Sequence, residues 1–591
     1  MSAEQLSPGT NFTEPREGPV DIASASTAIG AMEAIAEKGP VGSPQLLGSL
    51  EGYKQIFGQP YLASPGYRAV KAFFENGGSS LWFSRAGHYD TIGDKSTLDM
   101  VSALLQLQGD GPANTFLLNA TSPGAHGNAL AVVPTRVDTL AATGGALAAS
   151  AQTSYVVSDV RRLYVGAQVH IKDTVAPTTN NLRVIITSID PTAKRIMFPS
   201  ATPAGAITAG NVYLEEFNLS TYKGGVAQTP SYSLMSMSTT AGSKYFMTVI
   251  NKGDPADHIL VKTNDALVLS NTVDPRPATS STSLPFTSGS DGTTPTDADF
   301  VGDSAGGTGL YAFDTIEDIN LLAIPGRCTA TVHAGITTYV EYRGFIFGVL
   351  ATNSGLTPEQ AKTYVDTTAN LYSEFAAIYY PWIKATDPVT GVLGTFSPEG
   401  DIMGVYARVD ATRGVQKAPA GTPDSKLVNV LGVERTLTKT DRDLLYPANI
   451  NTINAFKGKG TVLWGSRTLA LGQFRQIPVR RVFLFARMSI KAGTMWVTFE
   501  ENNATTRARV RKSVGAWLLR QWRRGVLKGK TASEAFYILC DETNNPPSVE
   551  NAGNLKCRVG LAVSRPAEFL DFELVQDTRA LDKELAEAGI S

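Results

Sequence analysis

Continuous apolar runs separated by helix-length segments dominate the chain after residue 309. Three of them are INLLAI (319–324), FIFGVL (345–350) and AAIYYPWI (376–383). Their apolar residues follow one another without alternation, which is typical of strands that are covered on both faces. Parallel strands need a crossover between them, and the intervening segments are long enough for helices. The pattern therefore predicts a β-α-β-α-β unit in which helices cover a parallel sheet.

Two helices carry recognisable end signals. Thr357 can cap the second intervening helix, Pro358 suits its first turn, and Gln360 completes a capping box. Earlier in the chain, the segment 67–75 has helical apolar spacing and ends at Asn76 and Gly77. We expect a helix there, followed by a short strand at LWF (81–83).

Residues 131–309 differ in composition from the rest of the chain. Thr, Ser, Gly, Pro and Asn dominate, and short β-branched runs such as LRVIITSI (182–189) alternate with turn residues. This composition predicts a β-rich insertion. Its last part, 278–309, is close to low complexity, so we expect a surface loop or linker there.

The last third of the chain predicts mixed structure. VFLFA (482–486), TMWVTF (494–499) and FYILC (536–540) have the composition of strands, whereas 506–524 has that of a long helix that ends at a glycine. Residues 567–576 show the alternation of a strand. At the other end, the stretch 7–20 is rich in Pro and Gly, which predicts an extended arm.

Size and composition indicate a globular protein of several domains. Of its 591 residues 42% are apolar and 18% are charged, which excludes a disordered, collagen-like or coiled-coil chain. The formal net charge of −2 gives no global attraction for nucleic acid or an acidic surface. Three cysteines in so long a chain favour assembly in a reducing compartment. The beginning lacks an export signal and no apolar stretch reaches about 18 residues, so we expect no membrane partner.

Two motifs of catalytic proteins occur without their usual context. GDSAG (302–306) places Ser304 in the pattern of a serine-hydrolase elbow, but no apolar strand precedes it and the only downstream histidine is His333. The segment 525–531 resembles a phosphate-binding loop, but its glycine spacing is one residue short and a helix precedes it. A glycine-rich linker and a capped turn are the better interpretations. A serine hydrolase remains an alternative function.

Metal ligands do not cluster in the sequence. The five histidines have no Cys or His partner at ligand spacing. Asp291, Asp297 and Asp299 lack the alternating spacing and distal Glu of a calcium loop. We therefore expect no catalytic residue, no metal site and no cofactor.

Basic residues concentrate in one window. Residues 475–530 contain fourteen Lys and Arg against Glu500 and Glu501, a net charge of +12 in a chain whose total is −2. On a helical wheel at about 100° per residue, one face of the predicted helix gathers apolar side chains. These are Val510, Val514, Trp517, Leu518 and Trp522. Arg509, Lys512, Arg520, Arg523 and Arg524 gather on the opposite side.

This basic face has three interpretations. It is a solvated surface, a contact for nucleic-acid phosphates, or a contact for an acidic protein surface. Stacking of nucleic-acid bases needs exposed aromatic residues, whereas both tryptophans of the helix fall on its packing face.

The chain resembles the contractile tail sheath proteins of bacteriophages and related injection machines. The most specific blocks are 480–503, 508–545 and 565–574, which resemble the sheath carboxy-terminal domain. INLLAIPG (319–326), FAAIYYPWI (375–383) and residues 404–421 resemble the sheath α/β domain, whose topology is subtilisin-like. In the first half, residues 26–58, VKAFFENGG (70–78) and SPGAHGNAL (122–130) are similar to the family. The resemblance is weakest between 131 and 309, where the family has variable, outward-facing insertions, and it does not extend to the acidic end after Gln576.

The resemblance implies a structural protein that is not an enzyme. Sheath subunits assemble as helical, hexameric rings around an inner tail tube and contract to drive that tube through the host cell envelope for genome ejection. The implied partners are further copies of the chain, the tube protein, and the baseplate and tail terminator proteins, with no direct nucleic acid. The implied location is the virion tail, assembled in the host bacterial cytoplasm. A phage-derived injection particle, of tailocin or secretion type, is an alternative, as is, more remotely, a nucleic-acid-binding protein.

Together, residues and resemblance give a domain division. We expect an amino-terminal arm at 1–20, the first part of the sheath core at 21–130, the β-rich insertion and linker at 131–309, and the α/β domain at 310–470. A mixed α+β carboxy-terminal domain that faces the tube follows at 471–565, and an arm with an acidic tail at 566–591. The arms would donate strands to neighbouring subunits. Their candidate contact residues are Pro8, Gly9, Phe12, Glu14, Phe569, Leu570, Phe572 and Leu574.

Overall fold

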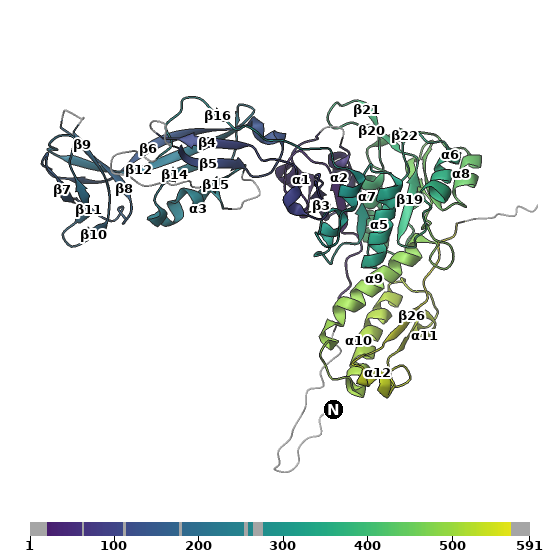
Figure 1. The fold of residues 1–591 in the computed structure, drawn as a ribbon. Helices are drawn as coiled ribbons and strands as arrows, with labels where there is room; N and C mark the ends of the chain where they lie inside the picture. The colour runs from purple at the N-terminus through teal and green to yellow at the C-terminus, as the bar shows by residue number, and fades with distance from the viewer. Residues whose placement is uncertain are drawn as a thin grey trace, which may run out of the picture. The chain divides into compact units, whose positions relative to one another are not determined.

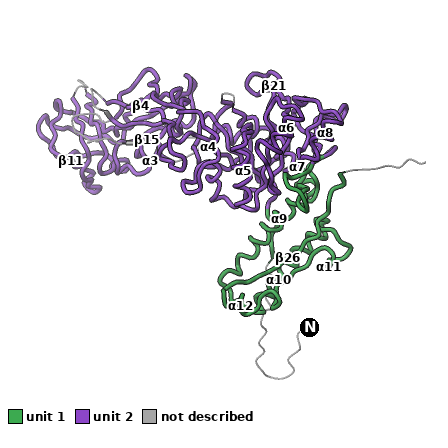
Figure 2. Tube along the Cα trace, turned by 45° about the vertical axis from the view of Figure 1, so that its right-hand side comes forward, with its two compact units in different colours: residues 1–25, 409–420, 466–591 green, residues 26–408, 421–465 purple. Residues whose placement is uncertain are grey.

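The computed structural model describes residues 21–61, 64–109, 114–175, 180–252, 258–263 and 276–568. The chain divides into two compact units (Figure 2). Unit 1 comprises residues 1–25, 409–420 and 466–591, and unit 2 comprises residues 26–408 and 421–465. The predicted arm contacts lie outside the described residues: Pro8, Gly9, Phe12, Glu14, Phe569, Leu570, Phe572 and Leu574.

An eight-stranded sheet with flanking helices forms the α/β part of unit 2 (Figure 1). Its order is β2-β3-β1-β17-β18-β19-β23-β24, in which the two edge strands pair antiparallel and the other pairs are parallel. The strands are β2 (Gln45–Leu47), β3 (Leu81–Arg85), β1 (Gly30–Ala34), β17 (Leu321–Ala323), β18 (Phe347–Ala351), β19 (Ala376–Tyr380), β23 (Ile450–Phe456) and β24 (Gly460–Trp464).

The predicted β-α-β-α-β unit is confirmed. Strands β17, β18 and β19 are parallel neighbours, and every residue in them is buried, as continuous apolar strands require. The predicted strand at 81–83 is also present as β3. Strand β1 was not predicted; it is a fully buried strand of Gly, Ala, Met and Glu that lies between β3 and β17. These residues are weak strand formers, so pairing with remote strands is what makes the segment extended.

The helices of unit 2 follow the predicted end signals. In α6 the Thr357 side chain accepts from the Gln360 backbone N–H, and the Gln360 side chain accepts from the Thr357 backbone N–H, so the capping box is confirmed. The predicted helix near residue 67 is α2, which ends at Asn76. The α-helices of this unit are α1 (Leu50–Phe57), α2 (Gly66–Glu75), α3 (Phe246–Ile250), α4 (Asp297–Val301), α5 (Ala330–Arg343), α6 (Pro358–Thr363), α8 (Lys439–Leu445) and most of α7 (Glu399–Arg413).

The middle of the chain is rich in β-structure, as predicted. Strands β6 (Leu130–Gly144) and β12 (Gly210–Lys223) pair along almost their whole lengths. The remaining strands are β4 (Leu104–Gln108), β5 (Asn114–Ala120), β7 (Gln152–Val156), β8 (Gln168–Asp173), β9 (Asn181–Ile185), β10 (Ser188–Asp190), β11 (Arg195–Ala201), β13 (Val226–Ala227), β14 (Tyr232–Met235), β15 (Ile259–Thr263) and β16 (Leu284–Pro285). A separate three-stranded sheet of unit 2 contains β20 (Ile383–Thr386), β21 (Leu393–Phe396) and β22 (Val430–Val433).

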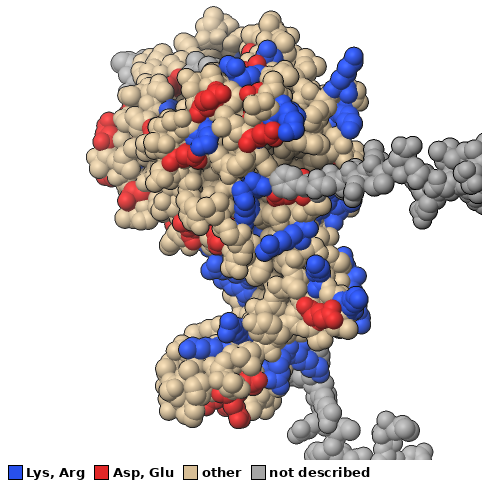
Figure 3. Space-filling model, turned by 90° about the vertical axis from the view of Figure 1, so that its right-hand side faces the viewer, with Lys and Arg blue, Asp and Glu red and all other residues tan. Residues whose placement is uncertain are grey.

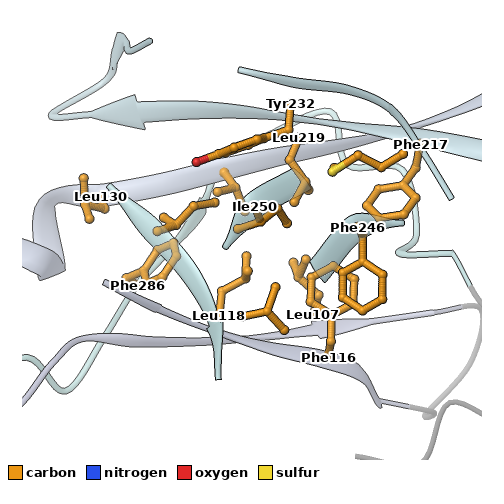
Figure 4. Close-up of a cluster of buried hydrophobic side chains, with 14 of the residues drawn as sticks. Leu107, Phe116, Leu118, Leu130, Phe217, Leu219, Tyr232, Phe246, Ile250 and Phe286 are labelled. Carbon is orange, nitrogen blue, oxygen red and sulfur yellow. The ribbon is translucent and has the colours of Figure 1, made fainter. Parts of the chain in front are cut away.

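One apolar cluster joins strands from both sides of residue 131 (Figure 4). The rings of Phe116 and Phe246 lie 4.5 Å apart between centroids, and Phe217 packs beside them. Leu107 and Phe286 belong to the same cluster. The β-rich structure therefore begins upstream of the predicted start, at β4.

The expected surface loop or linker at 278–309 is wrong in part, because the segment contributes to the core. Phe286 and Phe300 are buried at 1% and 2% exposure. Helix α4 starts with a capping box of Thr296 and Asp299, and Asp299 also accepts from the backbone N–H of Tyr89. Composition failed here because a few aromatic anchors are enough to fold a segment that is otherwise polar.

Unit 1 contains two long helices and a small hairpin. Its elements are α9 (Ile477–Gly493), a 3₁₀ turn (Met495–Val497), α10 (Ala504–Arg523), α11 (Ala532–Ala535), β25 (Phe536–Leu539), α12 (Pro547–Asn551) and β26 (Arg558–Leu561). The predicted strand at 536–540 is confirmed as β25. The predicted strands at 482–486 and 494–499 are wrong, because they lie in α9 and in the turn that follows it. A short apolar run does not distinguish a strand from a buried helix segment, and burial of Val482, Ala486 and Ser489 shows helical spacing.

Candidate binding surface of unit 1

Helix α10 carries all the predicted basic site residues except Arg524, which caps its end. The side chain of Asn503 accepts from the Thr506 backbone N–H at 2.9 Å and starts the helix. The helix runs for 20 residues to Arg523. The helix predicted from 506 to 524 is therefore confirmed, with a start two residues earlier.

The predicted packing face of α10 is buried. Val510, Val514, Trp517 and Leu518 are at most 3% exposed, and Trp522 is partly buried. They form one cluster with residues of α9, and the ring of Phe485 lies 5.5 Å from that of Trp517 between centroids. This cluster is the core of unit 1.

The first described residues of the chain complete this core. Ile22 is 1% exposed within the cluster. The backbone N–H of Ala25 donates to Ser489 Oγ at 2.9 Å, and Trp517 Nε1 donates to Ser24 Oγ at 3.3 Å. Residues 21–25 are thus attached to both long helices, directly after the predicted amino-terminal arm.

The last described residue is attached to the same unit. Arg467 Nη2 donates to Glu568 Oε2 at 2.5 Å, and Gln476 Nε2 donates to Glu568 Oε1 at 3.0 Å. Burial raises the pKa of Glu568, but the bonds from Arg467 and Gln476 outweigh this effect and lower the pKa below its ordinary value. Both predicted arms therefore adjoin anchored residues of unit 1.

The five predicted basic residues fall into two groups. Arg509 lies over the ring of Trp496, 4.7 Å from its centroid. Arg520 pairs with Asp21 at 2.6 Å and donates to the carbonyl oxygen of Ile22 at 2.8 Å. These two side chains thus contribute to the fold of unit 1 itself.

Lys512, Arg523 and Arg524 are exposed and form no ion pair within the described ranges of the chain. We call them the exposed basic triplet. Lys512 and Arg523 are separated by about three helical turns, so they lie on one line along α10. The other two basic residues flank the buried face rather than oppose it.

Counting charges along the sequence overstates the basic surface. Arg480, Arg481 and Arg507 are buried. Arg481 pairs with Asp410 at 2.6 Å, and Arg507 pairs with Glu550. Lys and Arg side chains nevertheless gather on unit 1, in the lower part of the view in Figure 3. An anionic surface is the complement that such a face favours.

Sequence reasoning missed an apolar feature beside α10. Met495 and Phe499 lie in the connection from α9 to α10, and their side chains are 65% and 103% exposed. The predicted strand at 494–499 hid this exposure, because a strand would bury alternate residues. Exposed large apolar residues next to basic ones are typical of protein contact surfaces.

The serine-hydrolase alternative finds no support in the geometry. Ser304 is exposed in a turn in which Asp303 accepts from the backbone N–H groups of Ala305 and Gly306. His333 is buried, and its Nδ1 lies 2.7 Å from the hydroxyl of Tyr364. Burial lowers the pKa of His333 to about 4. No bond between Ser304 and a histidine occurs in the described part of the chain.

The other ligand sites considered from sequence also lack support. In the segment 525–531, the N–H of Lys528 donates to Ala562 O and that of Lys530 to Glu534, so these amides already have partners. Among the residues described, His, Cys, Asp and Glu form no group of three or more that could hold a metal ion. The described helices include none that is long and apolar enough to span a membrane.

Two family models match adjacent parts of the chain. Residues 302–469 match the phage tail sheath protein central domain, and residues 472–577 match the phage tail sheath C-terminal domain. The chain is 28% identical over 227 residues to the tail sheath protein of Enterobacteria phage T4, covering 38% of this chain and 33% of that protein. It is 28% identical over 185 residues to the tail sheath protein of Vibrio phage KVP40, covering 31% of this chain and 27% of that protein. The match thus spans about a third of the length of these curated relatives.

Solved structures show that the fold is shared more widely. The helical sheath of the anti-feeding prophage in its contracted state has a TM-score of 0.52 and 18% identity, covering 97% of this chain and 100% of that chain. A sheath tail protein from Listeria innocua has a TM-score of 0.52 and 10% identity, covering 92% of this chain and 96% of that chain. The fold is thus that of a mixed α/β multidomain sheath protein. Residues 302–577 therefore belong to the contractile phage tail sheath family.

Proposed function

We propose that the protein is the structural subunit of a contractile tail sheath. It assembles as helical, hexameric rings around an inner tail tube and contracts to drive the tube through the host cell envelope for genome ejection. The observation that carries this proposal is the match of both sheath family models across residues 302–577. The proposed partners are further copies of the chain, the tube protein, the baseplate and the tail terminator. Its place is the virion tail, assembled in the host cytoplasm.

A phage-derived injection particle is the second candidate. It is favoured by the similarity in fold to the anti-feeding prophage sheath over nearly the whole chain. The 28% sequence identity of part of the chain to the sheath proteins of phages T4 and KVP40 favours a phage tail. Both candidates use the same mechanics and differ in what the tube delivers.

The two structural parts of unit 2 have different proposed roles. The eight-stranded sheet with its helices corresponds to the subtilisin-like α/β domain of the family, in topology only. The β-rich region after residue 103 corresponds to the outward-facing insertion. Contraction itself needs no catalysis, because a lattice assembled in a metastable form relaxes when a trigger releases it.

The arms link each subunit to its neighbours by adding strands. Support comes from the anchoring of Ile22 and Glu568 in unit 1, since strand exchange transmits force only if the base of each arm is fixed. Each added backbone hydrogen bond contributes about 0.5–1.5 kcal/mol, and the lattice multiplies these contributions.

Truncation tests the carboxy-terminal arm. We expect removal of residues 569–591 to leave a folded subunit that fails to form tubes, because the cut spares the Glu568 anchor. Negative-stain microscopy measures tube formation, and circular dichroism checks the fold. Tubes of normal length from the truncated protein would contradict strand donation by this arm.

The exposed basic triplet faces an acidic inner tube. Ion pairs at a wet interface are individually weak, which allows the sheath to release the tube during contraction. Because Arg509 and Arg520 have partners within unit 1, Lys512, Arg523 and Arg524 are the residues that remain for a partner.

Charge reversal tests this surface. The variant Lys512→Glu/Arg523→Glu/Arg524→Glu should still fold and form sheath, but should co-sediment with purified tube at least tenfold less at low salt. A matched control reverses the same number of exposed charges on the β-rich region, Arg161→Glu/Lys194→Glu/Arg195→Glu. Equal tube binding by both variants would remove the triplet from the interface.

A further inference from the structure

Two cysteines face each other at the end of the β25–β26 hairpin of unit 1. The strands pair antiparallel, with Ile538 opposite Val559 and Leu539 opposite Arg558. The next step of the same register places Cys540 opposite Cys557. Directly opposed residues of an antiparallel pair have Cα atoms about 4.5–5.5 Å apart, which is within the range that a disulfide spans.

Two asparagines hold the loop between the cysteines closed. Asn544 Nδ2 donates to the carbonyl oxygens of Leu539 and Lys556, each at 2.8 Å. Asn545 Nδ2 donates to Lys556 O at 2.9 Å, and the Lys556 N–H donates to Asn545 Oδ1 at 2.6 Å. Leu539 and Lys556 directly precede the two cysteines. The backbone on both sides of the pair is therefore fixed before any covalent bond forms.

The two thiols differ in exposure and acidity. Cys540 is buried, whereas Cys557 is exposed. Cys540 lines a cavity of about 370 Å³ together with Arg507 and Arg511. A hydrogen bond from Cys557, followed by the charges of these two arginines, lowers the pKa of Cys540, and the same hydrogen bond raises the pKa of Cys557. Cys540 is thus the better thiolate, and Cys557 is the thiol that a reagent reaches.

We propose that Cys540 and Cys557 are a modification site at which a small-molecule disulfide, such as oxidised glutathione, closes an intramolecular disulfide. The bond would join the ends of the loop that the asparagines already hold, and it would form when the protein leaves the reducing compartment in which it is made. This proposal does not rest on the sheath function.

Oxidised glutathione is the oxidant that accepts the two electrons of the reaction. Cys557 passes its proton across the hydrogen bond to Cys540, and the resulting Cys557 thiolate attacks one sulfur of oxidised glutathione and forms a mixed disulfide. The first glutathione leaves as a thiolate and takes the proton from Cys540. The Cys540 thiolate then attacks Cys557 Sγ, breaks the mixed disulfide and expels the second glutathione as a thiolate. Two protein thiols are oxidised to one disulfide, and one glutathione disulfide is reduced to two thiols.

Thiol counting tests the proposal on the full chain. The reduced protein is incubated with oxidised glutathione, quenched with acid and titrated with Ellman's reagent in denaturant. Of the three thiols in the chain, we expect one to remain, and peptide mass spectrometry should show residue 540 linked to residue 557. Dithiothreitol should restore all three.

Single substitutions separate the possible outcomes. Cys328→Ser is the matched control, because Cys328 is buried in unit 2. In this variant both remaining thiols should be lost, because Cys540 and Cys557 form the same disulfide. Cys540→Ser should stop at a mixed disulfide on Cys557. Three free thiols in the treated wild-type protein, glutathione retained on Cys557 beside a free Cys540, or covalent dimers on a non-reducing gel would each overturn the proposal.

Discussion

The parallel sheet of unit 2 and the helical core of unit 1 are stabilised in different ways. Strands β17, β18 and β19 bury every residue, and their side chains come from one continuous part of the chain. The core of unit 1 needs Ile22 from the beginning of the chain and Val415 from its own short middle segment in addition to α9 and α10. Burial of local apolar runs explains β17 to β19, whereas β1 to β3 of the same sheet and the core of unit 1 depend on segments that are remote in sequence. Unit 1 is the smaller of the two units, so we expect it to be the one that small changes disturb most.

Truncating one large core side chain in each unit should have the largest effects on the free energy of unfolding. Trp517→Ala removes the largest side chain of the unit 1 core and should lower the free energy of unfolding by about 3–5 kcal/mol, and Leu350→Ala in β18 should cost about 2–5 kcal/mol. We expect Trp517→Ala to unfold unit 1 alone. Hydrogen exchange measured by mass spectrometry should then show lost protection in α9 and α10 and kept protection in β18 and β19. Simultaneous loss in both units would show that they unfold as one.

The difference between local and remote contacts also explains which features could be predicted from the sequence. Local signals gave β17 to β19, the capping box at Thr357 and the buried face of α10, since each depends on neighbouring residues. Strand β1 could not be predicted, because Gly30 and its neighbours become extended only between two remote strands. Likewise, the basic helix could be predicted from local sequence. The ion pair between Arg520 and Asp21 could not be predicted, because these residues are separated by almost the whole chain.

The anchor at Glu568 has an intermediate expected effect. Glu568→Gln removes the charge that Arg467 binds and should lower the free energy of unfolding of unit 1 by about 1.5–3 kcal/mol at pH 7. Because the pKa of Glu568 is lowered in the folded protein, its contribution is present above the ordinary value of 4.5 and is lost as the pH falls through the lower folded pKa. Urea unfolding followed by tryptophan fluorescence should show the wild-type advantage shrinking below about pH 4.5. A constant difference down to pH 3 would contradict this role.

The smallest expected effects come from helix caps, which test the contrast between the units because the same type of hydrogen bond starts a helix in each of them. Asn503 starts α10 and Thr357 starts α6, each by accepting a backbone N–H, so replacement by alanine should cost about 1 kcal/mol at either position. The consequences should differ, because α10 supplies more of the core of unit 1 than any other element does, whereas α6 is a short helix of unit 2. We expect Asn503→Ala to raise hydrogen exchange along the whole of α10, and Thr357→Ala to raise it only in the first turn of α6. Equally local effects at both caps would mean that unit 1 is no more dependent on single contacts than the sheet is.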